Sequence, residues 1–253
     1  MKGANRMKLR VIGCAGGYPM GDNGTSSYLL SSSTGDYHVL LDAGSGSALA
    51  IEKYLDVNSL DAVVLSHDHP DHVADVGIFQ HLFLLKKPAP KQTPIPIYHF
   101  PDSGFAKFLA DDGSSLATPY QPNSVLDLGP FSMTFIKTVH PLECYAMRIL
   151  ERETGKVIVY TADSGWMEAM IAFTSGADLL IADCNFPNEF GQNDKHFTAE
   201  EVAKLANEAK VKTLVPTHLP PQADRGLIIG QVMKDLNKDI SLIEAYPGAL
   251  YEI

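Results

Sequence analysis

Short apolar runs that alternate with stretches of helical period constrain the fold of this 253-residue chain more than any other feature. Such runs, bounded by Gly, Pro and Asp, predict strands, and apolar residues spaced three and four apart predict helices. The alternation is typical of a layered α/β domain. Strands are predicted near residues 7–13, 25–31, 37–42, 61–65, 95–99, 131–138, 144–151, 156–161, 178–183 and 212–216, helices near 46–55, 73–86, 198–210 and 223–237, and two short final strands within 240–252.

Local capping and turn residues fix some of these boundaries. Ser45 or Ser47 is expected to cap the helix near 46–55, because a serine side chain can accept a hydrogen bond from a free N–H of the first turn. Thr198 and Glu201 match a capping box at the start of another helix. The segment 153–156 is predicted to be a hairpin turn.

Neither an internal repeat nor a linker divides the sequence, so we predict one domain over 1–253, with residues 1–6 as a frayed N-terminal extension. The cysteines Cys14, Cys144 and Cys184 are odd in number, widely spaced and free of any C-x-x-C pattern. This spacing argues against both a disulfide framework and a thiolate zinc site, and favours buried, reduced thiols.

The charge of the chain limits the partners it can bind. The formal net charge is −10 at pH 7, and no basic cluster breaks the acidic surface. Because an extended nucleic-acid track needs clustered positive charge, we expect no such surface and favour a small or short substrate. No apolar run approaches the roughly 18 residues of a membrane span, and no apolar signal region follows the first positive charges, which predicts a cytoplasmic protein.

A dense group of metal-binding side chains follows the apolar run 62–65. His67, His69, Asp71 and His72 lie within six positions, together with one further aspartate. Alternate side chains at a strand end, here His67 and His69, point to one side, and a turn can bring Asp71 and His72 to a neighbouring point. Imidazole and carboxylate suit zinc first, with manganese or iron as alternatives.

This string resembles the H-x-H-x-D-H signature of the metallo-β-lactamase superfamily. The resemblance implies an αββα sandwich, in which two mixed β-sheets carry helices on their outer faces. It also requires a histidine, an aspartate and a second histidine, each after a strand in the second half of the chain. His140, Asp163 and His218 each follow an apolar run there.

The family's ligand pattern implies two divalent metal ions and a hydroxide that bridges them. His67, His69 and His140 would bind one ion; Asp71, His72 and His218 would bind the other, with Asp163 between both. Asp71 would also orient the hydroxide, which makes it a catalytic residue.

Four residues outside the ligand pattern have their own expected roles. Asp42, in a segment similar to the family's strand-to-loop segment, is expected to orient the metal loop without binding a metal. The pattern has no place for His38, His81 and His99, which we interpret as structural.

Within the superfamily the sequence is most similar to the ribonuclease Z-like branch of phosphodiesterases. The segments 13–19 and 25–30 resemble that branch's glycine-rich loop and the strand after it, and 195–206 resembles its histidine-threonine helix start. The resemblance gives His196 the role of phosphate contact or general acid.

One departure from that branch argues against tRNA 3′ processing. The tRNA-gripping arm of typical ribonuclease Z lies between the equivalents of His140 and Asp163, but only 22 residues separate them here, nearly all of which two strands would use. Relatives often form homodimers, so the resemblance also allows a homodimer.

The leading hypothesis is a dinuclear metal-dependent hydrolase, in which a metal-bridging hydroxide attacks small or short phosphodiesters, cyclic nucleotides or RNA fragments among them. A lactone or thioester hydrolase on the same ions is the first alternative. A non-catalytic metal-binding protein is the second, and the apparently complete ligand set disfavours it.

Overall fold

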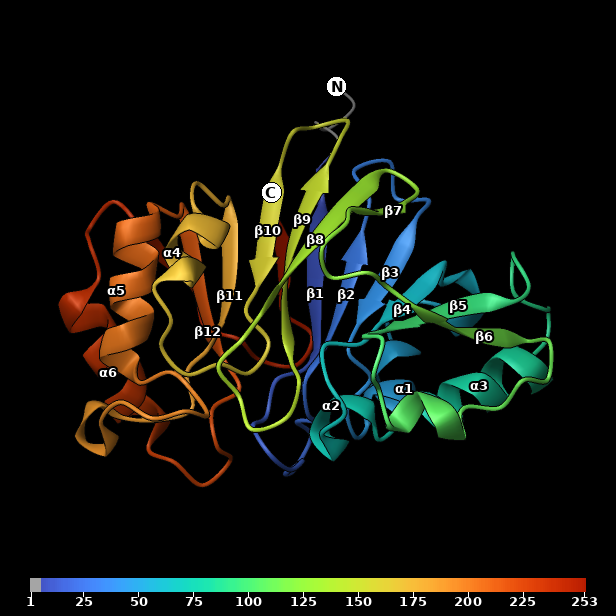
Figure 1. Ribbon diagram of the computed structural model, residues 1–253, viewed down its shortest axis with the longest axis horizontal. Coiled ribbons are helices and arrows are strands. Elements are labelled where there is room, and N and C mark those ends of the chain that lie inside the picture. Colours follow the sequence, from blue (N-terminus) through green and yellow to red (C-terminus); the bar gives the residue numbers. More distant parts are fainter. Residues whose placement is uncertain (1–5) are drawn as a thin grey trace.

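The computed structural model describes residues 6–253 and contains two seven-stranded sheets that pack face to face (Figure 1). In the first sheet β1 to β3 pair antiparallel and β3 to β6 pair parallel, with β14 antiparallel to β1. Its strands, in spatial order, are β14 (Leu250–Glu252), β1 (Lys8–Gly13), β2 (Ser27–Ser31), β3 (His38–Leu41), β4 (Ala62–Val64), β5 (Ile95–His99) and β6 (Ser115–Pro119).

The second sheet is also mixed. β7 to β10 pair antiparallel and β10 to β13 pair parallel. Its strands, in spatial order, are β13 (Ser241–Leu242), β12 (Thr213–Thr217), β11 (Leu179–Asp183), β10 (Val157–Tyr160), β9 (Tyr145–Glu151), β8 (Phe131–Lys137) and β7 (Leu126–Leu128).

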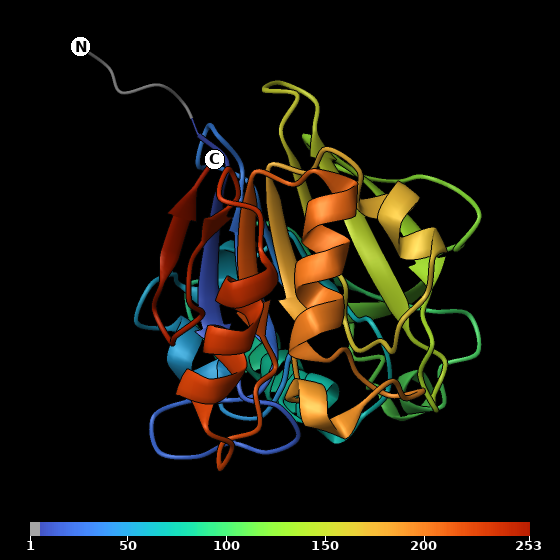
Figure 2. The same ribbon diagram turned by 90° about the vertical axis from the view of Figure 1, so that its left-hand side faces the viewer.

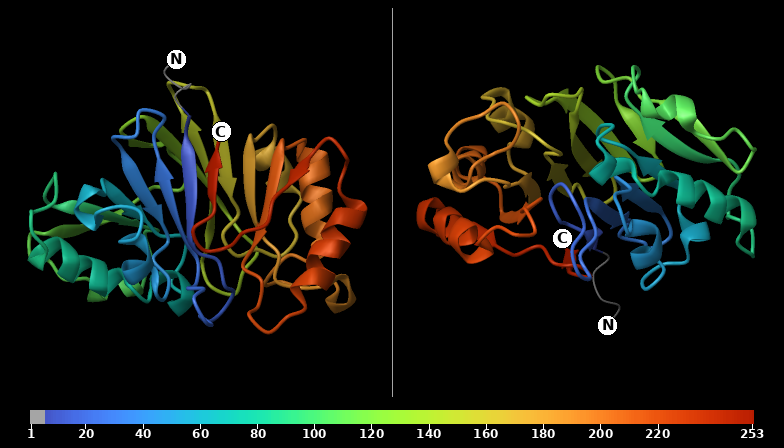
Figure 3. Two further views of the ribbon diagram at one scale, coloured as in Figure 1. Left: turned by 180° about the vertical axis from the view of Figure 1, so that it is seen from behind. Right: turned by 90° about the horizontal axis from the view of Figure 1, so that it is seen from below.

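Helices cover the outer face of each sheet, as the two flanks of the molecule show from behind (Figure 3). On the second sheet α5 and α6 lie side by side (Figure 2). The helices are α1 (Ser47–Ile51), α2 (Pro70–Val73), α3 (Val76–Leu85), α4 (Ala169–Thr174), α5 (Ala199–Ala209) and α6 (Arg225–Asp235), with 3-10 turns η1 (Val57–Ser59), η2 (Phe105–Phe108) and η3 (Asn188–Phe190).

The central strands bury side chains on both faces, which makes this a four-layer structure. In β10, Ile158 and Tyr160 pack between the sheets, whereas Val157 and Val159 pack under the helices. The side chains of β3 and β4 alternate in the same way. Because successive strand residues face opposite sides, such uninterrupted apolar runs are stable only where both faces are covered. The predicted αββα sandwich is therefore confirmed.

The structure corrects several predicted elements. β6, β7 and α4 were not predicted. β6 and β7 are edge strands, which backbone pairing can hold without a continuous apolar run. The predicted helix 73–86 begins later, as α3 after Asp75, because Val73 ends the separate short helix α2, which has Pro70 as its first residue. The two final strands, β13 and β14, join different sheets.

The start of the described chain packs against its end. Met7 is fully buried, and its carbonyl accepts a hydrogen bond from Ile253 N–H at 2.9 Å. Of the predicted frayed extension 1–6, Arg6 is exposed and residues 1–5 lie outside the described residues. In residues 6–253, no helix has the length and apolar content that a membrane span requires.

The cap of α1 differs from the prediction. Gly46 precedes the helix without a side-chain cap, and the Asp75 carboxylate accepts a hydrogen bond from Ala48 N–H at 2.9 Å. The Ser47 hydroxyl is buried and has no partner among the described residues. The helix α1 is therefore capped by an aspartate distant in sequence and not by the predicted local serine. At α5, Thr198 and Glu201 form the predicted capping box.

Asp75→Ala is expected to lower the free energy of unfolding by about 1 kcal/mol, the typical value of a helix cap. Ser47→Ala should cost nothing, because it removes a buried hydroxyl without a hydrogen-bond partner. Urea denaturation of both variants measures the difference. A larger loss in Ser47→Ala than in Asp75→Ala would contradict this account of the cap.

Candidate metal centre

Strands from both sheets end at one place, near α2 in Figure 1. Parallel strands present their carboxyl ends at the same edge of a sheet, and β3 with β4, and β10 with β11 and β12, are parallel sets. Antiparallel pairing to β9 on both sides gives β8 the direction of β10. The polar residues at or just after these ends are Asp42 (β3), His67 (β4), His140 (β8), Asp163 (β10), Asp183 (β11) and His218 (β12).

Three of these ends turn through left-handed backbone. Asp42, Ala162 and His218 have φ values of 55°, 50° and 58°. Left-handed backbone costs a non-glycine residue roughly 1–2 kcal/mol. Backbone hydrogen bonds hold two of the turns in place, since Asp42 N–H donates to Val64 at 2.9 Å and His218 N–H donates to Cys14 at 3.1 Å. The fold thus maintains sharp turns where they aim site residues.

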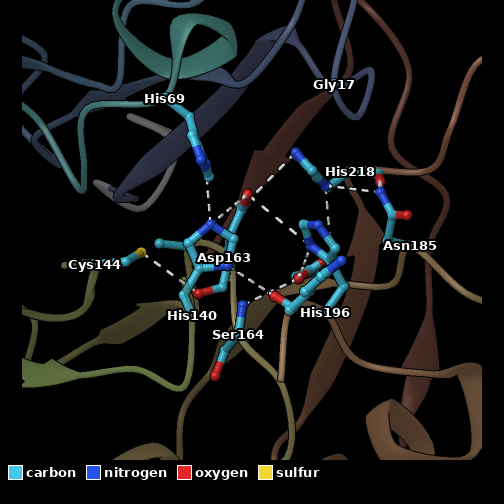
Figure 4. Close-up of polar contacts among 12 residues, drawn as sticks. Gly17, His69, His140, Cys144, Asp163, Ser164, Asn185, His196 and His218 are labelled. Carbon is cyan, nitrogen blue, oxygen red and sulfur yellow. Dashed lines mark hydrogen bonds and ion pairs between the residues drawn. The ribbon is translucent and has the colours of Figure 1, made fainter. Parts of the chain in front are cut away.

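One group of ligand atoms comes from both halves of the chain. His67 Nε2 and His140 Nε2 each lie 3.0 Å from His69 Nδ1. Asp163 Oδ2 lies 3.6 Å from His67 Nε2 and 3.8 Å from His140 Nε2. All four ligand atoms are within 4.8 Å of one another, so one cation could contact them together. Figure 4 shows three of these residues, His69, His140 and Asp163.

A second group lies on the other side of Asp163. Asp163 Oδ1 is 3.3 Å from His72 Nε2 and 3.5 Å from His218 Nε2. Asp71 Oδ2 is 3.1 Å from His218 Nε2 and 3.6 Å from His72 Nε2. Asp163 therefore turns one oxygen to each group, and all seven predicted ligand residues lie together.

The electrostatics of the two groups differ. Burial lowers the pKa values of His67, His69 and His140, so their rings stay neutral and keep lone pairs for a metal. Burial also opposes charge on His218, but the Asp163 carboxylate leads the opposing interactions, and they raise the pKa to about 10. The second group therefore attracts positive charge.

His72 shows that a cation fits the second group. Its Nε2 atom is fully buried and has no hydrogen-bond partner among the described residues, although two carboxylates face it. Burial disfavours the charged ring, but Asp163 and Asp42 outweigh burial and hold the pKa of His72 well above its usual range. A divalent ion bound by His72 Nε2 and the facing carboxylates would satisfy the buried nitrogen and offset their charge.

Asp42 lies behind His72 and is fully buried. Its carboxylate is 2.8 Å from His72 Nδ1 and accepts hydrogen bonds from Ser66 N–H at 2.7 Å, Ser66 Oγ at 2.8 Å and Tyr160 OH at 2.8 Å. A carboxylate in this position fixes the ring so that Nε2 faces the ligand group. The orienting role of Asp42 stays a prediction, and this geometry is what that role requires.

His196 lies beside both ligand groups (Figure 4). Its ring centroid is 5.5 Å from that of His140 and 5.1 Å from that of His218. His196 Nδ1 is 2.9 Å from Asp183 Oδ2, which also accepts a hydrogen bond from Ser164 N–H at 3.1 Å. Burial opposes charge on the ring, but the Asp183 carboxylate outweighs it and raises the pKa of His196.

Sequence reasoning missed Asp183 and Gly17. Asp183 ends a buried strand beside those that carry Asp163 and His218, and its position at that strand end was the available signal. Its Oδ1 atom lies 3.5 Å from His218 Nδ1. The Gly17 N–H donates to Asp71 Oδ2 at 2.9 Å, and Gly17 adopts φ 78°, which favours glycine. No spacing rule links a loop amide to a carboxylate 54 positions away.

The histidines and cysteines outside the cluster make ordinary structural contacts. His38 Nδ1 is 2.9 Å from Ser31 Oγ, and His99 Nδ1 is 2.8 Å from the Phe100 carbonyl. His81 lies exposed on α3. The predicted buried, reduced thiols are confirmed. The Cys144 thiol lies at the site, where it donates a hydrogen bond to the Asp163 carbonyl oxygen at 3.4 Å.

A cavity of about 340 Å³ opens directly onto the cluster. Its polar wall includes His69, Asp71, Asp163, His196 and His218. A volume of this size accepts a small substrate. Its other lining residues are Gly16, Gly17, Tyr18, Asn185 and Pro220.

Comparisons with known proteins agree with this architecture. Residues 37–219 match the family model described as the beta-lactamase superfamily domain. The probable metallo-hydrolase YhfI of Bacillus subtilis (strain 168) is 42% identical over 221 residues, which cover 85% of this chain and 87% of YhfI. The crystal structure of YhfI, described as a metallo-beta-lactamase fold protein, aligns with a TM-score of 0.90 at 36% identity over 98% of this chain and 99% of that one.

More distant structures share the fold. The short form of human tRNase Z aligns with a TM-score of 0.76 at 17% identity, over 97% of this chain and 98% of that one. A diphosphatase of the PhnP family aligns with a TM-score of 0.75 at 17% identity, over 98% of each chain. The chain therefore belongs to the β-lactamase superfamily of metallo-hydrolases. Between His140 and Asp163 it has only β9 and β10, so the long arm is absent.

Asp42→Asn is expected to weaken zinc binding by about 10- to 100-fold, because the ring of His72 loses its carboxylate partner. Competition with a chromophoric chelator measures the affinity. Asp61→Asn is the matched control, since Asp61 is another buried carboxylate, directly before β4, but pairs with His38 N–H and Lys91. Wild-type zinc affinity in folded Asp42→Asn protein would refute the orienting role.

Proposed function

We propose that this protein hydrolyses small or short phosphodiesters with the help of two divalent cations. The observation that carries the proposal is the His196–Asp183 pair, in which His196 lines the cavity beside both ligand groups and Asp183 holds its ring. A histidine held by a carboxylate and facing a cation site is suited to contact an anionic substrate and to donate a proton to it.

The cluster supplies a complete set of donors for two ions. His67, His69 and His140 would hold one ion, and Asp71, His72 and His218 the other, with one oxygen of Asp163 for each. Zinc suits the nitrogen-rich first group, and manganese or iron would suit the second, where two carboxylates contribute. When bound, such ions lower the pKa of coordinated water, so that they supply a nucleophile at neutral pH, and offset negative charge on the substrate.

His196 would act through its Nε2 atom. Nδ1 lies against Asp183, and no group of residues 6–253 hydrogen-bonds Nε2. Because Asp183 raises the pKa of the ring, the protonated form extends toward neutral pH. An Nε2–H in the cavity can donate to a phosphoryl oxygen and then protonate the leaving oxygen.

Asp71 is the second residue with a proposed catalytic role. Gly17 N–H donates a hydrogen bond to its Oδ2 atom at 2.9 Å, and Asp71 lines the cavity. A carboxylate fixed in this way can orient the attacking water and accept its proton. The nucleophile is then derived from water, and no side chain of this mechanism forms a covalent intermediate.

The pairing of His196 with a carboxylate favours a phosphodiester over a lactone or thioester. A phosphodiester brings a full negative charge and gains more during the attack, so a hydrogen-bond donor beside the reacting atoms stabilises its transition state. A neutral carbonyl substrate develops a single oxyanion, for which the metal ions alone would suffice. The roles of a human tRNase Z and a PhnP-family diphosphatase, as their names state them, agree with phosphate chemistry on this fold.

His196→Ala should reduce the hydrolysis of bis(p-nitrophenyl) phosphate by about 10²- to 10⁴-fold, the usual contribution of a proton-transfer residue. Metal content, measured by mass spectrometry, should stay normal, because His196 is outside the two proposed ligand sets. His81→Ala changes an exposed histidine and should leave the rate unaltered. Unchanged turnover in His196→Ala would show that His196 neither contacts the phosphate nor transfers a proton, and would remove the observation that carries the proposal. Absence of turnover in the wild type, with activity on a lactone or thioester, would favour the alternative function.

Asp183→Asn should shift the alkaline limb of the pH–rate profile to lower pH. The reaction needs protonated His196, so the rate falls as pH rises through the pKa of that ring. The Asp183 carboxylate raises that pKa, and its neutral replacement removes the effect. The measurement is kcat/KM between pH 6 and 9 at saturating metal. An alkaline limb that stays in place would show that His196 is not the titrating acid.

A further inference from the structure

Tyr18 lines the cavity, and its side chain has no structural role that explains its position. Its side chain is 46% exposed, and its hydroxyl makes no hydrogen bond within residues 6–253. A large aromatic side chain gains stability when it packs against another flat apolar surface, so this half-exposed ring in the cavity lining is available to a ligand.

The loop that carries Tyr18 is fixed at several points. Gly16 N–H donates to the Leu219 carbonyl at 3.0 Å, and Met20 and Asn23 exchange two backbone hydrogen bonds at 3.1 Å. Gly17 N–H, one position before Tyr18, holds Asp71 at 2.9 Å. The position of the ring is therefore coupled to a carboxylate of the candidate metal centre. A ring on a constrained loop loses little entropy when a ligand packs on it.

The lining of the cavity combines two kinds of residue. Besides the histidines and aspartates it includes the aromatic Tyr18 and Pro220, and Pro220 follows Leu219, whose carbonyl anchors the Tyr18 loop. A substrate that fills such a cavity has a charged end that meets the polar wall and a flat, weakly polar end that meets the ring. Its volume of about 340 Å³ suits a ligand about the size of one nucleotide.

We infer that Tyr18 is a specificity residue that stacks on the base of a nucleoside phosphodiester. This inference rests on the proposed function, since the phosphate must lie at the metal centre for the base to reach the ring. Every nucleobase has a flat π-face, so stacking on Tyr18 selects for the presence of a base without selecting which one. Purely aliphatic or sugar phosphodiesters would fill the polar wall and leave the ring uncovered.

The test compares two competitive inhibitors that differ only in the base. Adenosine 5′-monophosphate and ribose 5-phosphate are each titrated against bis(p-nitrophenyl) phosphate hydrolysis by the metal-loaded, full-length protein. Because both are measured against the same substrate, the ratio of their inhibition constants is independent of how that substrate binds. The variants are Tyr18→Ala, Tyr18→Phe and the control Tyr246→Ala, which changes a tyrosine that is 60% exposed and does not line the cavity.

The wild type should bind the nucleotide at least about fivefold more tightly than the sugar phosphate, the lower end of the effect of one stacked base. The ratio should fall to near one in Tyr18→Ala and persist in Tyr18→Phe and Tyr246→Ala. An equal affinity in the wild type, or a preference that survives Tyr18→Ala, overturns the role of Tyr18 while phosphodiester hydrolysis stands. A wild type that neither hydrolyses the substrate nor binds either compound overturns both proposals together.

Discussion

The buried carboxylate of Asp163 is the constraint on which the rest of the site depends. Its two oxygens face two different groups of histidine nitrogens, at 3.6–3.8 Å on one side and 3.3–3.5 Å on the other. The charged histidines beside it hold its pKa well below the usual range, against the strong opposing effect of burial. A charge so far from water is stable only with positive partners, and protons on the rings or metal ions can fill that role.

The fold brings these partners together by ending strands of both sheets at one edge. His67 and His72 come from the first half of the chain, and His140 and His218 from the second, so neither half is a complete site. The inner faces of both sheets form one apolar cluster, which fixes their relative position and thus the spacing of the ligands. Left-handed turns at the strand ends complete the geometry, and their strain persists because the packed sheets hold them.

Much of this arrangement was predictable from the sequence, because it depends on short patterns of neighbouring residues. The apolar runs predicted most strands, and the resemblance to the superfamily then selected residues that follow them, such as His140 and His218. The edge strand β6 and the α1 cap by Asp75 were missed, since both depend on long-range backbone contacts that no local pattern records. Asp183 was missed for a different reason: a carboxylate at the end of an apolar strand also occurs at ordinary turns.

Anomalous diffraction from crystals of the zinc- or manganese-loaded protein tests the central claim most directly. The account predicts two peaks, one among His67, His69 and His140 and the other among Asp71, His72 and His218, with Asp163 between them. A single peak, or a metal bound elsewhere while this cluster holds only water, would contradict it.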